Sequence, residues 1–207
     1  MSHKITVIIL IYEESLNTIF NCLKSVKDFK IIIVDNANNN KRKNQIIKNF
    51  NIYKYILNKK NLGFGKANNI GIKNCDTEYL LILNPDCTIS SNSIKKLLKS
   101  MNTYDDCYMT VPTFVDIKGK LIQNAAPFPE TEIKETFINL EGDMCCQSAL
   151  GAAMFLKTNI MKNLEMFDEN FFIFYEDADL CRRINRMKKS VIQVFDAKAI
   201  HQHGEGK

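Results

Sequence analysis

The sequence lacks any CxxC pair and any regular cysteine spacing, although it contains seven cysteines in 207 residues. An odd number of irregularly spaced cysteines argues against a disulfide framework and favours reduced thiols in a cytosolic setting. Cys145 and Cys146 are adjacent, and a redox or metal-binding pair is the alternative to two small, at least half-buried side chains.

The sequence also lacks a hydrophobic run of the roughly 20 residues that a membrane-spanning helix needs. Residues 5–12 are apolar and follow Lys4, but they end at Glu13-Glu14 without the small-residue cleavage site of a secretory signal. We therefore expect a soluble or peripheral protein that is cytoplasmic.

Neither sign of charge dominates strongly, because the net charge is +5 at pH 7. No basic block or basic-aromatic interleaving of the kind that follows a nucleic-acid backbone is present, so nucleic acid is not an expected partner. The small positive excess would suit anionic substrates or an anionic membrane surface, and it does not decide between them.

Two common phosphate-binding motifs are also missing. No GxxxxGK[ST] occurs, which excludes a P-loop. The stretch NLGFGKANNIG begins like GxGxxG, but Asn68 stands where the third glycine should be. The stretch also does not follow the first strand of the chain, which disfavours a dinucleotide-binding fold.

What the sequence does contain is a regular alternation of buried strands and amphipathic helices. Continuous β-branched runs are typical of strands buried on both faces, and Ser15 is placed to cap the first helix. The expected strands are residues 4–12, 30–36, 53–57, 78–86, 107–115 and 148–156, with helices after the first, second and fourth and a loop over 125–137. This order predicts one α/β domain with a mostly parallel central sheet covered by helices on both faces.

Polar residues follow three of the predicted strands, at Tyr12-Glu13, Asp35-Asn36 and Asn84-Pro85-Asp86. Ligands of open α/β sheets bind outside the carboxyl ends of the strands, so these residues are expected to share one binding rim. Helix capping is the alternative explanation for each carboxylate taken alone.

The stretch FFIFYEDADLCRRI, residues 171–184, presses aromatic residues against three carboxylates. Leu180, Ile184 and Met187 recur at helical spacing, so a helix should begin near Glu176, and first-turn acids suit its dipole. The aromatic run is not explained by capping. It suggests a carboxylate that is partly desolvated, with a raised pKa, or that faces a cation.

Seven segments, in this order, resemble the family 2 glycosyltransferases of the GT-A fold, most closely a bacterial rhamnosyltransferase-like branch that builds surface polysaccharide. They are VIILIY, IIIVDNAN, NLGFGKANNIGI, YLLILNPDC, GAAMFL, FDENFFIFYEDADLCRRI and HQHG. The resemblance covers residues 5–204. It implies a nucleotide-binding half over about 1–105 and an acceptor-binding, catalytic half over about 106–207, with the C-terminal helices of some relatives missing.

The resemblance also implies roles for individual residues. Asp35 would meet the base or ribose of a nucleotide, with Tyr12 and Glu13 beside it. The glycine-rich stretch would approach the ligand closely through Asn61, Gly63, Gly65 and Asn68. NPD stands where many relatives carry Asp-x-Asp, so Asp86 would bind a divalent cation, with Asn84 as a weaker ligand or a neighbour. His201 or His203 would supply a further ligand, which suits Mn²⁺ or Mg²⁺.

Asp177, next to Glu176, would be the catalytic base, and aromatic walls would exclude water around it. Asp179 is the second choice for the base, with pairing to Arg182 or Arg183 as its alternative role. The resemblance thus implies a metal-dependent, inverting hexosyltransferase. Its donor would be dTDP-rhamnose or a UDP-sugar, and its acceptor a saccharide or lipid-linked oligosaccharide at the inner face of the cytoplasmic membrane. A non-catalytic sugar-nucleotide-binding homologue and a sugar nucleotidyltransferase are the alternatives. The oligomeric state is not predicted.

Overall fold

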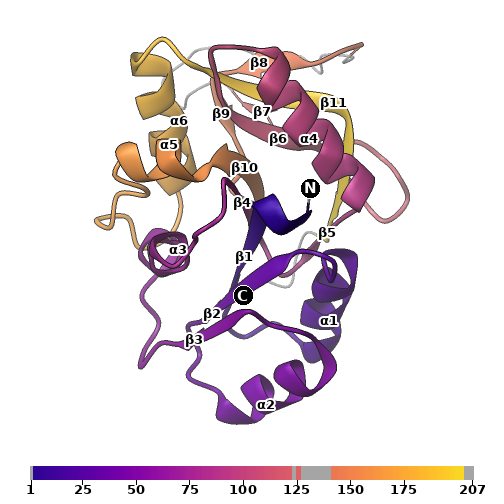
Figure 1. The fold of residues 1–207 in the computed structure, drawn as a ribbon, viewed down its shortest axis with the longest axis vertical. Helices are drawn as coiled ribbons and strands as arrows, with labels where there is room; N and C mark the ends of the chain where they lie inside the picture. Colours follow the sequence, from indigo (N-terminus) through magenta and orange to yellow (C-terminus); the bar gives the residue numbers. More distant parts are fainter. Residues whose placement is uncertain (1, 123–124, 127–140, 203–207) are drawn as a thin grey trace.

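The computed structural model describes residues 2–122, 125–126 and 141–202. A curled sheet runs through the molecule in the strand order β3-β2-β1-β4-β10-β6-β11-β5, and β8 pairs with β11 beside this path (Figure 1). A second, two-stranded sheet pairs β7 with β9. The α/β class predicted from the sequence is confirmed.

The N-terminal half alternates strand and helix, and its four strands are parallel. Ile8 and Ile9 of β1 pair with Ile32 and Ile33 of β2, and β1 also pairs with β4. The elements are η1 (Ser2–Lys4), β1 (Ile5–Ile11), α1 (Leu16–Ser25), β2 (Lys30–Asp35), α2 (Asn40–Asn49), β3 (Lys54–Leu57), α3 (Phe64–Lys73) and β4 (Tyr79–Leu83).

The second half is mixed in strand direction. β10 is antiparallel to both β4 and β6, β11 is parallel to β6, and β5 and β8 are antiparallel to β11. The elements are β5 (Cys87–Ile89), α4 (Ser91–Thr103), β6 (Cys107–Val115), β7 (Ala125–Ala126), β8 (Met144–Cys146), β9 (Ser148–Ala149), β10 (Ala153–Lys157), α5 (Thr158–Asn163), α6 (Glu176–Arg186) and β11 (Ser190–His201).

Two hydrophobic clusters lie on opposite faces of the sheet because successive side chains of a strand point to opposite faces. Val7 joins Ile9 and Leu81 in the cluster covered by α1 and α4. Ile8 and Ile82 belong to the cluster covered by α3, α5 and α6. In Figure 1 these two groups of helices flank the sheet, as predicted.

Local signals in the sequence account for most of the helix starts. Ser15 caps α1 by accepting a hydrogen bond from the Thr18 amide, as predicted, and Asn39 and Ser90 cap α2 and α4 in the same way. The strand predicted over 148–156 is interrupted: residues 150–152 separate β9 from β10. The elements η1, β5, β7, β8, α3 and α5 and the long strand β11 were not predicted. Strand β7 lies at the start of the loop expected over 125–137, and the rest of that loop lies outside the described residues.

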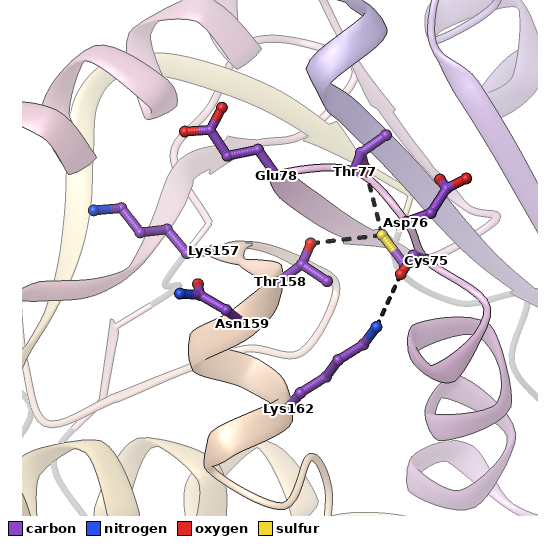
Figure 2. Close-up of a pocket in the computed structure, with 8 residues that line it drawn as sticks. All are labelled: Cys75, Asp76, Thr77, Glu78, Lys157, Thr158, Asn159 and Lys162. Atoms are coloured by element: carbon purple, nitrogen blue, oxygen red, sulfur yellow. Dashed lines mark hydrogen bonds between the residues drawn. The ribbon is translucent and has the colours of Figure 1, made fainter.

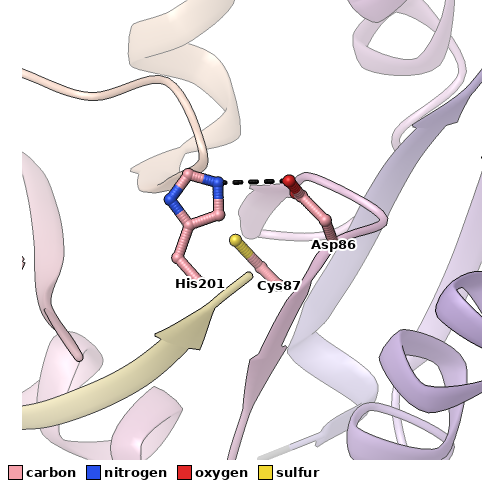
Figure 3. Close-up of side chains that lie close together, drawn as sticks. All are labelled: Asp86, Cys87 and His201. Carbon is pink, nitrogen blue, oxygen red and sulfur yellow. Dashed lines mark ion pairs between the residues drawn. The ribbon is translucent and has the colours of Figure 1, made fainter. Parts of the chain in front are cut away.

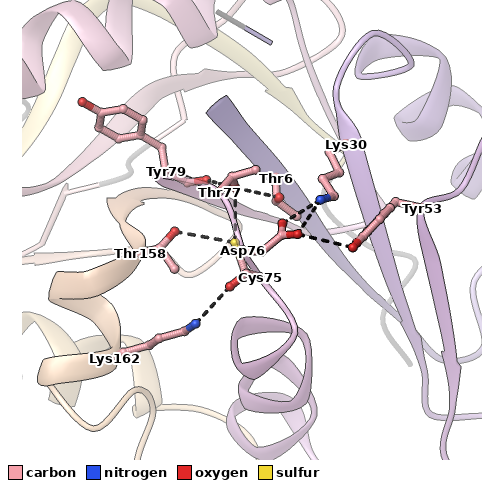
Figure 4. Close-up of polar contacts among 9 residues, drawn as sticks. All are labelled: Thr6, Lys30, Tyr53, Cys75, Asp76, Thr77, Tyr79, Thr158 and Lys162. Atoms are coloured by element: carbon pink, nitrogen blue, oxygen red, sulfur yellow. Dashed lines mark hydrogen bonds and ion pairs between the residues drawn. The ribbon is translucent and has the colours of Figure 1, made fainter. Parts of the chain in front are cut away.

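A hydrogen bond and an ion pair connect the segments where β1, β2 and β4 begin (Figure 4). The hydroxyls of Thr6 and Thr77 lie 2.7 Å apart, and Lys30 forms an ion pair with Asp76 at 2.6 Å. These contacts connect the amino ends of β1 and β2 to the residues just before β4. Among the described residues, none of the helices combines the length and the apolar character that crossing a membrane requires.

Candidate active site

The carboxyl ends of β1, β2 and β4 lie together on one rim of the sheet, as the sequence predicted. Ile11 at the end of β1 pairs with Asp35 at the end of β2, and the Asn36 amide donates to the Ile11 carbonyl at 2.9 Å. β4 runs parallel to β1 on its other side and ends just before Asn84. This rim therefore collects Tyr12, Asp35 and Asn84.

Asp35 is completely buried and fully engaged by the protein. Its Oδ1 accepts hydrogen bonds from the Arg42 guanidinium at 2.6 Å and from the Ala37 amide at 2.8 Å. Its Oδ2 accepts from the Tyr55 hydroxyl at 2.6 Å, and burial together with this carboxylate raises the pKa of Tyr55. Asp35 thus fixes the positions of Arg42, Ala37 and Tyr55 at the rim. Its contact with a nucleotide stays a prediction.

A cavity of about 730 Å³ opens beside this cluster. Arg42 reaches into its wall from α2 and also donates to the Tyr12 carbonyl, which ties the two sides of the cavity together. Tyr12 and Glu13 line it, and their contact with a nucleotide stays a prediction. The other lining residues are Glu14, Leu16, Ala37, Asn39, Lys41, Arg42 and Gln45.

Glu14 is a site residue that the sequence did not single out. Its Oε2 accepts a hydrogen bond from the Tyr12 amide at 2.7 Å, which shapes the turn after β1. Burial raises the pKa of Glu14, while Arg42 acts in the opposite direction. A run of two glutamates gives no signal for this role, because either side chain could turn inward.

Asp86, Cys87 and His201 form a cluster whose potential ligand atoms all lie within 4.8 Å of one another (Figure 3). Antiparallel pairing of β5 with β11 places His201 opposite Cys87, and the Gln202 amide donates to the Asp86 carbonyl at 3.0 Å. His201 Nε2 lies 3.3 Å from Asp86 Oδ2. The structure thus joins two of the predicted metal ligands; His203 lies outside the described residues.

Within this cluster the two carboxylate oxygens of Asp86 differ. Among the described residues Asp86 Oδ1 is buried without a hydrogen-bond partner, so it has capacity for a ligand. Burial raises the pKa of the Cys87 thiol well above its ordinary value. Asp86 and His201 supply the oxygen and imidazole nitrogen that could bind a cation here.

A chain of hydrogen bonds connects the NPD motif to Asp177. The Asn84 amide donates to the Ala152 carbonyl at 2.9 Å, and the Gly151 amide donates to Asp177 Oδ2, also at 2.9 Å. The Ala178 amide binds Asp177 Oδ1 at 2.7 Å. Asp177 is half-buried at the start of α6, so its carboxylate is both oriented by backbone amides and accessible.

The predicted aromatic walls around Asp177 are not formed. Phe172, Phe174 and Tyr175 are 57%, 70% and 62% exposed, so these side chains do not exclude water from the carboxylate. Glu176 faces inward instead of the rings, because α6 begins directly after Tyr175 and turns this acid toward the core.

Glu176 is the desolvated carboxylate of this stretch. It is 5% exposed, and its Oε2 has no hydrogen-bond partner among the described residues. Burial, with a smaller effect of the adjacent Asp177, raises the pKa of Glu176. Asp179 instead forms an ion pair with Arg183 at 2.8 Å, one helical turn later, which is the structural role that a first-turn acid often has.

The glycine-rich stretch supports the loop before α6. Gly63 has φ +80°, and a Cβ atom there would lie 2.2 Å from the carbonyl oxygen of Phe172. The Phe64 amide donates to that same carbonyl at 2.8 Å. The close approach that the glycine permits is therefore made by the protein's own backbone, where a ligand was expected.

The other predicted ligand residues of this stretch are likewise engaged within the protein. Asn61 Oδ1 accepts hydrogen bonds from the Asn36 side chain and from the Gly63 amide, both at 2.9 Å. Asn68 donates to the Phe64 carbonyl at 3.1 Å, and Gly65 packs against Phe167. Direct contact of Asn61, Gly63, Gly65 or Asn68 with a nucleotide stays a prediction.

A second hollow, of about 480 Å³, lies on the opposite rim between residues 75–78 and 157–162 (Figure 2). Lys162 Nζ donates to the Cys75 carbonyl at 2.9 Å, and Glu78 forms an ion pair with Lys4 at 3.0 Å. Lys162 and Glu78 already bind the backbone or an ion-pair partner, whereas the carboxyl-end rim holds the cluster of Asp86 and His201, so that rim is the better candidate for the active site.

A family model for glycosyl transferase family 2 matches residues 6–158. Among curated relatives, the low-salt glycan biosynthesis hexosyltransferase Agl10 of Haloferax volcanii is 24% identical over 97% of this chain and 68% of its own length. The dTDP-rhamnosyl transferase RfbF of Shigella flexneri is 23% identical over 99% and 71%. The rhamnosyltransferase WbbL of Escherichia coli K12 is 26% identical over 84% and 72%.

Two solved structures share the fold. GalNAc-T7, crystallised with UDP, GalNAc and Mn²⁺, superposes with a TM-score of 0.77 at 16% identity over 96% of this chain. S. aureus TarS superposes with a TM-score of 0.69 at 17% identity, also over 96%. The chain spans 44% and 36% of these two solved chains. Together with the family match, the likeness shows that this chain belongs to glycosyl transferase family 2 and has the GT-A fold.

Proposed function

We propose that this chain transfers a sugar, with inversion at the anomeric carbon, from a nucleoside-diphosphate donor to a saccharide hydroxyl. The observation that carries the proposal is the cluster of Asp86 and His201 together with its link to Asp177. Asn84, in the same NPD motif as Asp86, donates to the Ala152 carbonyl, and the preceding residue Gly151 donates to Asp177. A cation-binding pair and an accessible, oriented carboxylate are what displacement of a diphosphate by a hydroxyl requires.

Asp86 and His201 would hold the divalent cation. The buried Asp86 Oδ1 has capacity for a ligand. A carboxylate and an imidazole suit Mn²⁺ or Mg²⁺, and GalNAc-T7 was crystallised with Mn²⁺. When bound, the cation would offset the charge of the departing diphosphate.

The nucleotide would occupy the cavity beside Arg42. Tyr12 and Arg42 offer a ring and a guanidinium, and Arg42 Nε is buried without a hydrogen-bond partner among the described residues. A base carbonyl or a ribose hydroxyl could accept from that nitrogen. Residues of about 1–105 would then bind the nucleotide and residues of about 106–207 would supply the acceptor site and the base.

Asp177 would act as the general base. Its carboxylate accepts the proton of the acceptor hydroxyl as that oxygen bonds to the anomeric carbon, while the bond to the diphosphate breaks on the opposite face. Direct displacement with one base inverts the configuration, and no covalent enzyme intermediate is needed. Backbone amides of Gly151 and Ala178 hold this carboxylate in place.

The relatives suggest the donor. RfbF is named a dTDP-rhamnosyl transferase and WbbL a rhamnosyltransferase, which favours dTDP-rhamnose, whereas GalNAc-T7 was crystallised with UDP and supports a UDP-sugar. A surface-polysaccharide or lipid-linked acceptor would place the chain at the inner face of the cytoplasmic membrane.

The proposal is tested by incubating the chain with a panel of sugar nucleotides and saccharide acceptors, with Mn²⁺ or with a chelator, and measuring glycoside formation by mass spectrometry. Metal-dependent transfer that Asp177→Asn abolishes supports it. Nucleotide binding without turnover would favour a non-catalytic binding homologue. When nucleoside triphosphates and sugar 1-phosphates are supplied instead, formation of a sugar nucleotide with release of pyrophosphate would favour a nucleotidyltransferase. Either result overturns the proposal.

A further inference from the structure

Segment 172–175, which consists of residues 172–175, exposes four consecutive large apolar side chains. Phe172, Ile173, Phe174 and Tyr175 are 57%, 56%, 70% and 62% exposed. Nowhere else in the described part of the chain are two large apolar side chains consecutive and exposed. Contiguous apolar surface of this kind usually marks a binding site, because leaving it in water is unfavourable.

The segment is held in this exposed shape by its backbone. Phe174 and Tyr175 have φ values of +71° and +70°, in the left-handed region that residues with bulky side chains avoid. The Phe172 carbonyl accepts from the Phe64 amide at 2.8 Å, and the Tyr175 carbonyl accepts from the Asp179 amide, also at 2.8 Å. Both ends are therefore anchored, and the rings cannot simply collapse onto the core.

The segment adjoins Asp177 in space as well as in sequence. A Cβ atom built on Gly151 would lie 3.4 Å from Asp177 Oδ2 and 3.6 Å from the ring of Phe64. Phe64 is the residue whose amide holds the Phe172 carbonyl. Phe64 thus lies near both the Phe172 carbonyl and Gly151, whose amide donates to the Asp177 carboxylate.

We infer that segment 172–175 is the platform on which the acceptor saccharide stacks, with Phe174 and Tyr175 as its specificity-determining rings. This inference rests on the proposed function, since it identifies where the acceptor of that reaction binds. The faces of a sugar ring present C–H groups with a small positive charge, which complement the negative face of an aromatic ring. Tyr175 adds a hydroxyl that can bind a sugar hydroxyl.

Charge favours a saccharide over a membrane surface as the occupant. Glu176, Asp177 and Asp179 follow the segment directly, and the first turn of α6 holds no basic residue. Carboxylates so close to the rings would oppose approach to anionic lipid, whereas a neutral sugar has nothing to repel it. A carboxylate beside a stacked sugar is also in place to reach one of its hydroxyls.

The test uses the double substitution Phe174→Asn and Tyr175→Asn. Asparagine tolerates the left-handed conformation better than most residues, so the rings are removed while the backbone shape is kept. Tyr104→Asn is the matched control. Tyr104 is 40% exposed and follows α4, where the chain enters β6. Circular dichroism and thermal unfolding establish that both variants are folded.

Binding is measured by ligand-observed NMR with the methyl glycosides of rhamnose, glucose, galactose and N-acetylglucosamine, in the presence of UDP or dTDP and of Mg²⁺, which unlike Mn²⁺ is diamagnetic and does not broaden the ligand signals. At least one glycoside should bind, with saturation transferred to the C–H protons of one ring face. The double variant should weaken that binding about ten-fold, because each stacked ring contributes a factor of roughly two to ten. Tyr104→Asn should leave it unchanged.

The inference is overturned if no glycoside binds the unmodified chain, or if the double variant binds as well as the control. It is also overturned if the double variant loses binding only to phosphatidylglycerol vesicles, which would make the segment a lipid contact. Calorimetry of UDP and dTDP separates this failure from that of the proposed function. The double variant should bind both nucleotides normally, and absent nucleotide binding in the unmodified chain would count against the proposed function alone.

Discussion

Asp35→Ala should destabilise the protein by about 3–5 kcal/mol, because it removes one partner of a buried ion pair and leaves the other charge uncompensated. The carboxylate side chain is 0% exposed and the Arg42 side chain only 7% exposed, so water cannot replace the lost partner. The change also removes the hydrogen-bond acceptor of the Tyr55 hydroxyl and of the Ala37 amide, which both donate to Asp35. A loss of this size is a large part of the roughly 5–15 kcal/mol that usually stabilises a domain.

The assay is urea unfolding at neutral pH, followed by circular dichroism, for the unmodified chain and two variants. Asp76→Asn is the matched control, because Asp76 pairs with Lys30 at the same 2.6 Å separation but its side chain is 56% exposed. That exposed pair should contribute no more than about 1 kcal/mol.

The reasoning is refuted if Asp35→Ala costs no more than Asp76→Asn. A stable Asp35→Ala variant with weakened nucleotide binding would return Asp35 to the role of a direct ligand. The predicted result is the reverse: the stability loss comes first, and any loss of nucleotide affinity follows from the displacement of Arg42 in the cavity wall.

Three further predictions concern the loop and the helix start. Asp177→Asn should lower the transfer rate by about 10²–10⁴-fold with little effect on donor affinity, whereas Asp179→Asn should mainly lower the melting temperature. Steady-state kinetics and thermal unfolding of both variants separate the two roles. Full turnover in Asp177→Asn would contradict the assignment. Gly119→Ala should lower the free energy of unfolding by about 1–2 kcal/mol because of its left-handed backbone alone. Gly63→Ala should lower it clearly more, because the new Cβ would lie 2.2 Å from a carbonyl oxygen, whereas Gly119 has open space. Equal losses in urea unfolding would contradict this clash. Because burial raises the pKa of Glu176, the folded chain binds the proton of this carboxyl group more tightly than the unfolded chain. The contribution of Glu176 to stability should therefore fall as pH rises above about 4.3 and up to the folded pKa. Glu176→Gln should flatten this fall in unfolding free energies measured from about pH 4 to 7, and an unchanged slope would contradict the prediction.

Much of the fold follows from local patterns in the sequence. The β-branched runs around Ile8 and Ile32 can be buried only as strands covered on both faces, and Ser15 caps the helix that follows. The shared rim of Tyr12, Asp35 and Asn84 then follows from parallel strand order. These features depend on residues that are close in the chain, which is why the sequence predicts them.

The features that the sequence could not predict depend on contacts between distant segments. The pairing of β5 with β11 brings His201 beside Asp86 from a remote part of the chain; only the family resemblance predicted that these two residues meet, because no local pattern encodes the register. The partner of Gly63 is likewise far away in the chain: its missing side chain makes room for the Phe172 carbonyl. The aromatic residues before Glu176 were expected to face inward, but helix α6 starts where the acid turns in and the rings turn out.

The central claim is that Asp86 and His201 form a cation site that serves a nucleotide diphosphate. It is tested most directly by isothermal titration calorimetry of UDP and dTDP into the unmodified chain, with Mn²⁺ and with a chelator. We predict that Mn²⁺ tightens binding of one nucleotide by at least about ten-fold, as expected when charge-assisted contacts worth roughly 1.5–3 kcal/mol are gained, and that Asp86→Ala removes this difference. Equal affinity with Mn²⁺ and with chelator in the unmodified chain would contradict the claim.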